Sequence, residues 1–94
     1  MTLSPKRTLQ RTNRFSRDIK TLPVEVQQEA FNTARKLCRN VFDQEFDVKP
    51  MTGLKGFYRV VISHYYRMIF SYDDLNIYLR RIAHRKDIYR NIEL

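Results

Sequence analysis

Basic and aromatic side chains recur through residues 57–90 at spacings that could gather them around an anion. Side chains alternate between the two faces of a strand, so Arg59 and Arg67, each inside an apolar run, are expected to share one open face. Further along, Tyr89 follows the run Arg80-Arg81-Ile82-Ala83-His84-Arg85-Lys86. An arginine fork holds phosphate through two hydrogen bonds, and aromatic rings stack on unpaired bases. The pattern predicts a surface that binds a polyanion, and RNA is the polyanion we expect.

Cleavage of RNA at such a surface would need a base for the 2′-hydroxyl, an acid for the 5′-oxygen and cations around the phosphate. His84 is the most suitable acid or base by itself, because imidazole changes protonation near neutral pH. The phenol of Tyr89 is the alternative, since neighbouring arginines would favour its phenolate. Two histidines and one cysteine leave no cluster with metal-ligand spacing. We therefore expect neither a metal nor a cofactor.

The composition indicates one basic globular domain, residues 1–94, with a single modest core. The chain is 43% hydrophobic and carries a formal net charge of +8, which favours nucleic acid, an anionic membrane surface or an acidic protein as partner. No apolar window could span a bilayer and no signal peptide is recognisable, so we expect a cytoplasmic protein without a membrane partner. Cys38 cannot pair within the chain and is predicted to be a buried thiol.

Two helices are predicted within residues 15–41. Thr12 or Asn13 can cap the first, which ends at Pro23. In residues 24–41 the apolar and small side chains share one stripe and the charged ones lie mostly away from it, which is typical of an amphipathic helix. We expect the pair to form a helical hairpin on one face of a sheet.

Three strands are predicted after Gly56, where the period changes from 3.6 to two residues: 57–63, 65–72 and 75–83. Ser63-His64 and Asp73-Asp74 are short enough for tight hairpins, so residues 57–83 should form an antiparallel meander. Its core face should carry the aromatic side chains Tyr58, Tyr66 and Phe70.

The remaining segments have weaker patterns. Residues 1–14 are interpreted as a basic arm or an edge strand, and residues 42–53, with Pro50 and Gly53, as a loop. Residues 84–94 are predicted to be a turn or short helix, with Ile88 and Ile92 on one side.

Three pieces of this sequence together resemble the RelE/ParE superfamily of bacterial type II toxins. They are Leu54-Lys55-Gly56, the strand Tyr66-Arg67-Met68-Ile69-Phe70, and the run Ile82-Ala83-His84-Arg85-Lys86-Asp87-Ile88-Tyr89-Arg90. The resemblance covers about residues 14–90 in order. It implies an α+β fold of order β-α-α-β-β-β with a short C-terminal helix, in which the helical hairpin packs on an antiparallel sheet.

In the RelE branch the toxin enters the ribosomal A site and cleaves mRNA, with the RNA's own 2′-hydroxyl as nucleophile and basic residues in place of a metal. The resemblance implies that Arg59 stands where a catalytic lysine is often found, Arg67 at the phosphate-binding arginine, Arg85 at an arginine that assists the leaving group, and Tyr89 near the C-terminal catalytic tyrosine. A second lysine of the best-known branch is replaced here by Val61. The implied partners are a cognate antitoxin, mRNA and the ribosome with its rRNA.

The expected catalytic set is therefore Arg59, Arg67, His84, Arg85 and Tyr89, and the expected RNA-binding set is Lys55, Arg80, Arg81, Lys86 and Arg90. Two alternatives remain open at this point. A ParE-like toxin with the same fold would inhibit DNA gyrase without cleaving RNA, and a basic RNA-binding module would be non-toxic. The chain retains more of the catalytic set than a pure binder requires, which favours the nuclease.

Overall fold

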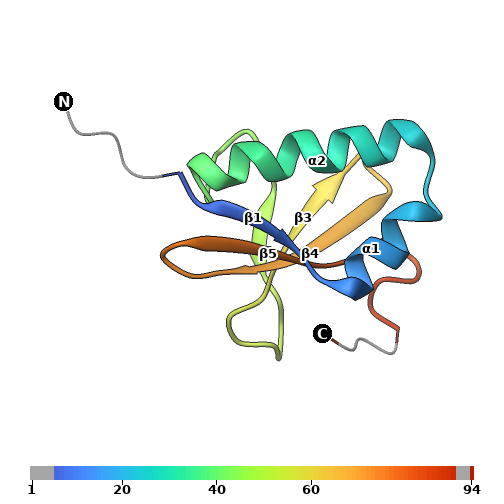
Figure 1. Cartoon of the computed structure of the whole chain (residues 1–94). Helices are drawn as coiled ribbons and strands as arrows, with labels where there is room; N and C mark the ends of the chain where they lie inside the picture. Colours follow the sequence, from blue (N-terminus) through green and yellow to red (C-terminus); the bar gives the residue numbers. More distant parts are fainter. Residues whose placement is uncertain (1–5, 91–93) are drawn as a thin grey trace.

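Two helices and five strands make up the described part of the chain, residues 6–90 and 94, in the computed structural model (Figure 1). Their order is β1 (Thr8–Arg11), α1 (Asn13–Lys20), α2 (Val24–Arg39), β2 (Val48–Pro50), β3 (Tyr58–Ile62), β4 (Tyr66–Tyr72) and β5 (Asn76–His84). The predicted α+β class and the strand-helix-helix-strand order are confirmed.

One mixed sheet contains all five strands, in the order β1-β5-β4-β3-β2. The predicted meander is confirmed, because β3, β4 and β5 pair antiparallel in chain order. The expectation of a purely antiparallel sheet was wrong: β1 is an edge strand parallel to β5, with Thr8 opposite Asn76 and Arg11 opposite Leu79. Parallel neighbours need a long connection, and here residues 12–75 lie between the two strands.

The segment predicted as a loop, residues 42–53, contains the short strand β2, so that interpretation was wrong in part. Val48 lies opposite Val60, Lys49 opposite Arg59, and Pro50 opposite Tyr58 on the neighbouring strand. Proline has no N–H to donate and is confined to sheet edges, and β2 is such an edge. Three residues are too few to show an alternating pattern.

The helices begin and end at recognisable sequence signals. Thr12 caps α1: its hydroxyl accepts from the Phe15 N–H at 3.2 Å and lies 3.0 Å from the Leu79 carbonyl, which ties the cap to β5. Pro23 stands at the start of α2, whose final turn carries Lys36 and Arg39, favourable positions for the helix dipole. The amphipathic stripe predicted for α2 is confirmed, although the helix ends at Arg39 rather than at residue 41.

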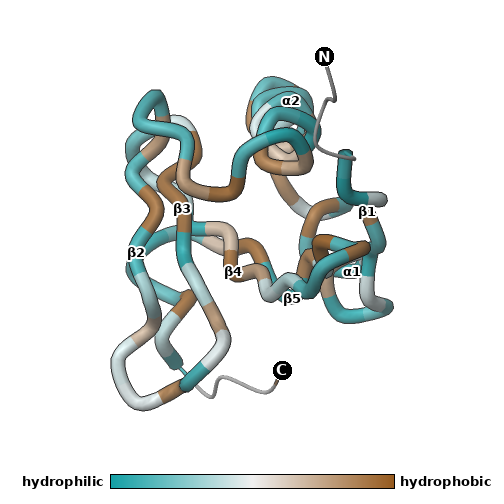
Figure 2. The backbone as a smooth tube through the Cα atoms, turned by 90° about the vertical axis from the view of Figure 1, so that its left-hand side faces the viewer, coloured by the Kyte–Doolittle hydropathy of each residue, from teal (hydrophilic) through white to brown (hydrophobic). Residues whose placement is uncertain are grey.

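The main core lies between the two helices and one face of the sheet (Figure 2). Phe15 and Ile19 of α1 and the apolar stripe of α2 pack with seven strand residues: Val60, Ile62, Met68, Phe70, Ile77, Leu79 and Ile82. Tyr58 and Tyr66 are half-buried against this core and Phe70 is fully buried, which confirms the predicted core face. Arg59 and Arg67 alternate with these residues and therefore belong to the opposite, open face.

An ion pair fixes α1 to the sheet close to an irregularity in strand pairing. The register of β4 and β5 shifts between Ile69 and Phe70, as in a β-bulge. Beside it, an Asp18 carboxylate oxygen accepts from Arg81 Nε at 2.7 Å and from the Ile82 N–H at 3.1 Å. The Arg81 side chain is only 16% exposed.

Both hairpin turns fall where the sequence predicts them. At the second, Asp73 Oδ1 accepts from the N–H groups of Leu75 and Asn76, at 2.9 and 2.8 Å. At the first, Ser63 and His64 have φ angles of 47° and 62°, in the left-handed region that residues other than glycine rarely adopt. The Ser63 hydroxyl is hydrogen-bonded to the Glu29 carboxylate of α2, which helps to hold this turn.

After β5 the chain makes a helical turn on the side of the sheet away from α2 (Figure 1). The N–H groups of Asp87 and Ile88 donate to the His84 carbonyl, at 2.8 and 3.0 Å. Ile88 is only 2% exposed although it lies outside the main core, whereas the predicted Ile92 is outside the described residues. The predicted turn is therefore present through Arg90.

Two smaller expectations concern single features. Cys38 is buried and free, as predicted, and its burial raises the pKa of the thiol. In the described ranges 6–90 and 94, neither helix has the length and apolarity that crossing a membrane requires.

Replacing Asp18 by alanine should lower the free energy of unfolding by about 2 kcal/mol, because Arg81 loses its partner in a mostly buried position and the Ile82 N–H loses its acceptor. Glu45→Ala is the control: it breaks the pair with Lys36, in which both side chains are 55% exposed, and should change stability by less than about 0.5 kcal/mol. Urea denaturation followed by circular dichroism measures both. Equal losses would contradict an anchoring role for Asp18.

The pH dependence of stability should report the turn at Asp73. Hydrogen bonds from the Leu75 and Asn76 N–H groups lower the pKa of Asp73, so the ionised carboxylate stabilises the folded state. That contribution is complete above the carboxyl's unfolded pKa and is lost as the pH falls through the lowered folded value. Asp73→Asn should therefore flatten the acid side of the curve of melting temperature against pH. Asp74→Asn removes the adjacent charge without these bonds, so an equal flattening there would argue against the turn as the cause.

Candidate functional site

A pocket of about 450 Å³ opens where β2, the loop after it, β3 and the C-terminal turn meet. Arg59 and Tyr89, both predicted site residues, line it together. The other lining residues are Lys49, Pro50, Met51, Thr52 and Leu54. The pocket therefore combines two cations, one phenol and an apolar wall.

The two cations of this pocket are direct neighbours across the sheet. Lys49 lies opposite Arg59 in the antiparallel pair β2–β3, so both side chains project from the same face. Like charges in such a pair repel one another. Among the described residues Asp47 offsets them: its carboxylate is 3.4 Å from Arg59 Nη1, in a side chain 52% exposed. An anionic ligand would relieve the repulsion that Asp47 offsets incompletely.

Tyr89 reaches this pocket through the turn that follows β5. Its neighbour Ile88 is buried, which fixes the turn, while Tyr89 itself is 52% exposed. An exposed phenol beside two cations can bind a phosphate oxygen or take part in proton transfer. Tyr89 was expected from the sequence to belong to one catalytic set with Arg59, and the structure brings these two residues to the same pocket.

Arg67 lies beside the pocket on the same open face, diagonal to Arg59. It is opposite Val61 on β3 and opposite Ala83 on β5. Its Nη1 donates to the carbonyls of His64 and Tyr66, at 2.8 and 3.0 Å. Within the described ranges no carboxylate pairs with Arg67, which is half-buried. The same guanidinium also supports the left-handed turn at His64.

Arg85 and His84 belong to a second group, around Tyr65 at the β3–β4 turn. The guanidinium of Arg85 lies 5.4 Å from the ring centroid of Tyr65, and that ring stacks parallel on His84 at 6.1 Å. His84 Nδ1 accepts from the Lys86 N–H at 3.1 Å, so this nitrogen is not available as a base while the turn is intact. Tyr65 is 55% exposed and was not among the residues singled out from the sequence.

The predicted RNA-binding residues differ in how exposed they are. Lys55, Lys86 and Arg90 are exposed. Arg80 is half-buried: its guanidinium lies 5.5 Å from the Phe57 ring and 5.4 Å from the Tyr78 ring, and its Nε donates to Ser71. Arg81 has a structural partner in Asp18. The exposed three are thus better placed for a large ligand than the other two.

Lys49 is a further cation that sequence reasoning missed, because residues 42–53 were interpreted as a loop. The described residues contain no group of three or more histidine, cysteine, aspartate or glutamate side chains that could hold a metal ion. The polar groups that line the pocket are a guanidinium, an ammonium, a phenol and the hydroxyl of Thr52.

No protein-family model and no curated protein matches the sequence. Solved structures do match. The toxin of the RelB–RelE antitoxin–toxin complex from Methanococcus jannaschii superposes with a TM-score of 0.74 at 23% identity, over 89% of this chain and 99% of that one. The chain has the RelE fold.

Two further structures agree with this result. The toxin–antitoxin complex RelBE2 from Mycobacterium tuberculosis gives a TM-score of 0.72 at 24% identity, over 87% of this chain and 94% of that one. The YoeB dimer from Staphylococcus aureus gives 0.75 at 15% identity, over 86% and 99%. The RelE fold therefore extends over nearly the whole of these chains, as the sequence resemblance implied.

The contribution of Arg67 to the stability of the fold can be measured separately from any role in a reaction. Arg67→Ala should lower the free energy of unfolding by about 1–2 kcal/mol, because two turn carbonyls lose a charged donor. Arg59→Ala breaks only an ion pair with an exposed partner and should lose less than about 1 kcal/mol. Urea titration of both variants tests this, and an unchanged Arg67→Ala would remove the turn-supporting role.

Proposed function

We propose that this chain is the toxin of a type II toxin–antitoxin system and that it cleaves mRNA on the ribosome. The observation that carries the proposal is the meeting of Arg59, Lys49 and Tyr89 around one pocket of the open face. The RelE fold supports it, because the solved structures that share it include complexes of toxins with antitoxins.

The proposed reaction is an attack of the 2′-oxygen of the RNA on the adjacent phosphorus. The 2′-oxygen–phosphorus bond forms and the bond from phosphorus to the 5′-oxygen breaks. A base takes the proton of the 2′-hydroxyl, and an acid delivers a proton to the departing 5′-oxygen. Negative charge grows on the phosphate oxygens, where Arg59 and Lys49 would stabilise it. Arg67, with no carboxylate partner in residues 6–90, would hold a neighbouring phosphate.

Tyr89 is our choice for the proton-transfer group. Its phenol is the side chain of the pocket best suited to exchange a proton with the RNA, since the arginine retains its charge. His84 lies with Tyr65 and Arg85, and its Nδ1 already accepts a hydrogen bond. Arg85 and His84 would then contact the RNA beyond the reacting phosphate, together with exposed Lys86 and Arg90.

The proposed regulatory partner is an antitoxin with an acidic or amphipathic segment over the open face. Such a segment would neutralise Arg59 and Lys49 and cover the exposed ring of Tyr89. The toxin would then act in the cytoplasm only when the antitoxin is absent.

Tyr89→Phe should slow mRNA cleavage on programmed ribosomes by about 100-fold or more, because the ring remains and the proton-transfer group is lost. Tyr72→Phe is the control: it also removes one phenol oxygen, but from a side chain that packs against the main core. Single-turnover cleavage of a defined mRNA measures both rates, and the control should retain the wild-type rate.

The same variants decide between the nuclease and its alternatives in living bacteria. Induction of the chain should produce codon-phased mRNA ends during growth arrest, and Tyr89→Phe should abolish them. Growth arrest with intact mRNA and inhibited DNA supercoiling would instead support a gyrase inhibitor and overturn the proposal. No arrest and no cleavage would leave the non-toxic RNA-binding module.

A further inference from the structure

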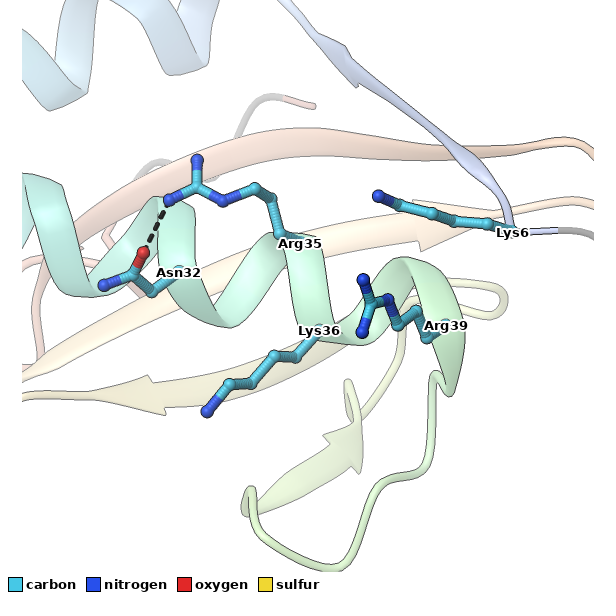
Figure 3. Close-up of a pocket in the computed structure, with 5 residues that line it drawn as sticks. All are labelled: Lys6, Asn32, Arg35, Lys36 and Arg39. Carbon is cyan, nitrogen blue, oxygen red and sulfur yellow. Dashed lines mark hydrogen bonds between the residues drawn. The ribbon is translucent and has the colours of Figure 1, made fainter.

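A second basic pocket, of about 310 Å³, lies on the outer side of α2, across the main core from the open face of the sheet (Figure 3). Asn32, Arg35, Lys36 and Arg39 line it at helical spacings of three, one and three residues, so they share one side of α2. Lys6, before β1, completes the lining. The N–H of Arg7 donates to the Cys38 carbonyl at 2.9 Å, which holds that segment beside the end of α2.

The charges of this pocket are poorly balanced. Arg35 donates to the Asn32 side chain, a neutral group, and Lys36 pairs with Glu45 at 3.2 Å in an exposed ion pair. In Figure 3, Lys6 extends toward α2 near Arg39, whereas Arg35 points along the helix toward Asn32. Among the described residues the four cations of the pocket have one paired carboxylate, Glu45, so they repel one another and an anion between them would lower that repulsion.

The basic surface continues along the helix toward its beginning. A neighbouring pocket shares Asn32 and Arg35 and extends to Gln28 and Phe31. The Phe31 ring does not offer a free stacking face there, because the Arg11 guanidinium lies 5.4 Å from its centroid and Phe15 packs edge-on at 6.0 Å. Arg11 thus adds a cation beside the neighbouring pocket, although it does not line it. We call the two joined pockets the basic groove, whose cations are Lys6, Arg35, Lys36 and Arg39.

The lining determines which polyanion fits. The pocket at Arg35 has no apolar or aromatic side chain, so it offers no stacking surface for unpaired bases. For the same reason it lacks the apolar anchor on which protein–protein interfaces usually depend. A duplex keeps its bases stacked inside and presents phosphates to the protein. The pocket at Tyr89 has the opposite character, with a phenol and apolar wall suited to a single strand.

We propose that the basic groove on α2 binds the sugar-phosphate backbone of double-stranded RNA, independently of the pocket at Tyr89. The inference rests on the proposed function and extends it, since a protein that binds an RNA duplex with one surface can bind single-stranded mRNA with the opposite surface. It does not require that cleavage occurs. The two surfaces lie on opposite sides of the main core, so both can be occupied at once.

The test uses two double variants of the full chain with the same change in charge. Lys36→Gln/Arg39→Gln removes a lysine and an arginine from the last turn of α2, within the groove. Arg17→Gln/Lys20→Gln removes the same residue types from the last turn of α1, outside it. Fluorescence anisotropy with a labelled RNA hairpin duplex, titrated at several salt concentrations, gives affinity and its salt dependence.

The groove variant should bind the duplex about tenfold more weakly at about 0.1 M salt, and its slope of log affinity against log salt should be shallower by about 1–2. The control should change by less than half as much. Equal losses in the two variants would show that only net charge matters and would overturn the proposal. A groove variant that loses more affinity for an unpaired strand of equal length than for the duplex would also overturn it.

A third measurement separates this inference from the proposed function. Tyr89→Phe should retain duplex affinity while it loses mRNA cleavage on ribosomes. Cleavage by the wild type without groove-dependent duplex binding would refute the groove alone. Groove-dependent duplex binding by a wild type that cleaves no mRNA would refute the nuclease alone.

Discussion

The burial of Ile88 is the interaction on which the candidate site depends. This side chain is 2% exposed on the side of the sheet that the helices leave open, and the turn that carries it brings Tyr89 to Arg59. Full burial of such a side chain stabilises the fold by about 1.5–3 kcal/mol. Two hydrogen bonds to the His84 carbonyl add to the stability of the turn. The geometry of the pocket therefore depends on this turn as well as on the sheet.

The two faces of the sheet have different roles: one stabilises the fold and the other carries the candidate site. One face is committed to the core, where α1 and α2 pack on seven apolar strand residues. The other carries cations whose partners are incomplete, chiefly Lys49, Arg59 and Arg67. A buried face gives the strands a fixed register, and the register in turn places those cations. The open face can therefore hold unfavourable like-charge neighbours without loss of the fold.

Local patterns were sufficient to predict the helices and the meander. The 3.6-residue stripe of α2, the cap at Thr12 and the alternation around Val60 and Met68 each depend on residues close in sequence. Pairing between distant segments could not be predicted in the same way. The parallel contact of β1 with β5 joins residues far apart in the chain, and β2 is too short and contains Pro50.

The candidate site shows the same limit. Alternation placed Arg59 and Arg67 on one face, but the bulge beside Ile69 interrupts the simple count along β5, where Arg80 and Arg81 acquire different partners. His84 and Arg85 do not line the pocket and contact the ring of Tyr65 instead. The sequence was sufficient to identify the candidate side chains, whereas the tertiary structure was needed to show that Arg59 and Tyr89 share a pocket.

The hydrogen bonds of Arg67 have a consequence for the thermodynamics of binding. One nitrogen of its guanidinium is already held by the His64 and Tyr66 carbonyls, so the side chain has lost much of its rotamer freedom before any ligand arrives. Immobilising a long side chain on association usually costs about 0.5–1.5 kcal/mol. For Arg67 this loss of side-chain entropy occurs when the protein folds, because its side chain is bound to a turn that keeps two residues in left-handed conformations. The strained backbone of Ser63 and His64 thus helps to hold the Arg67 side chain in place before a ligand binds.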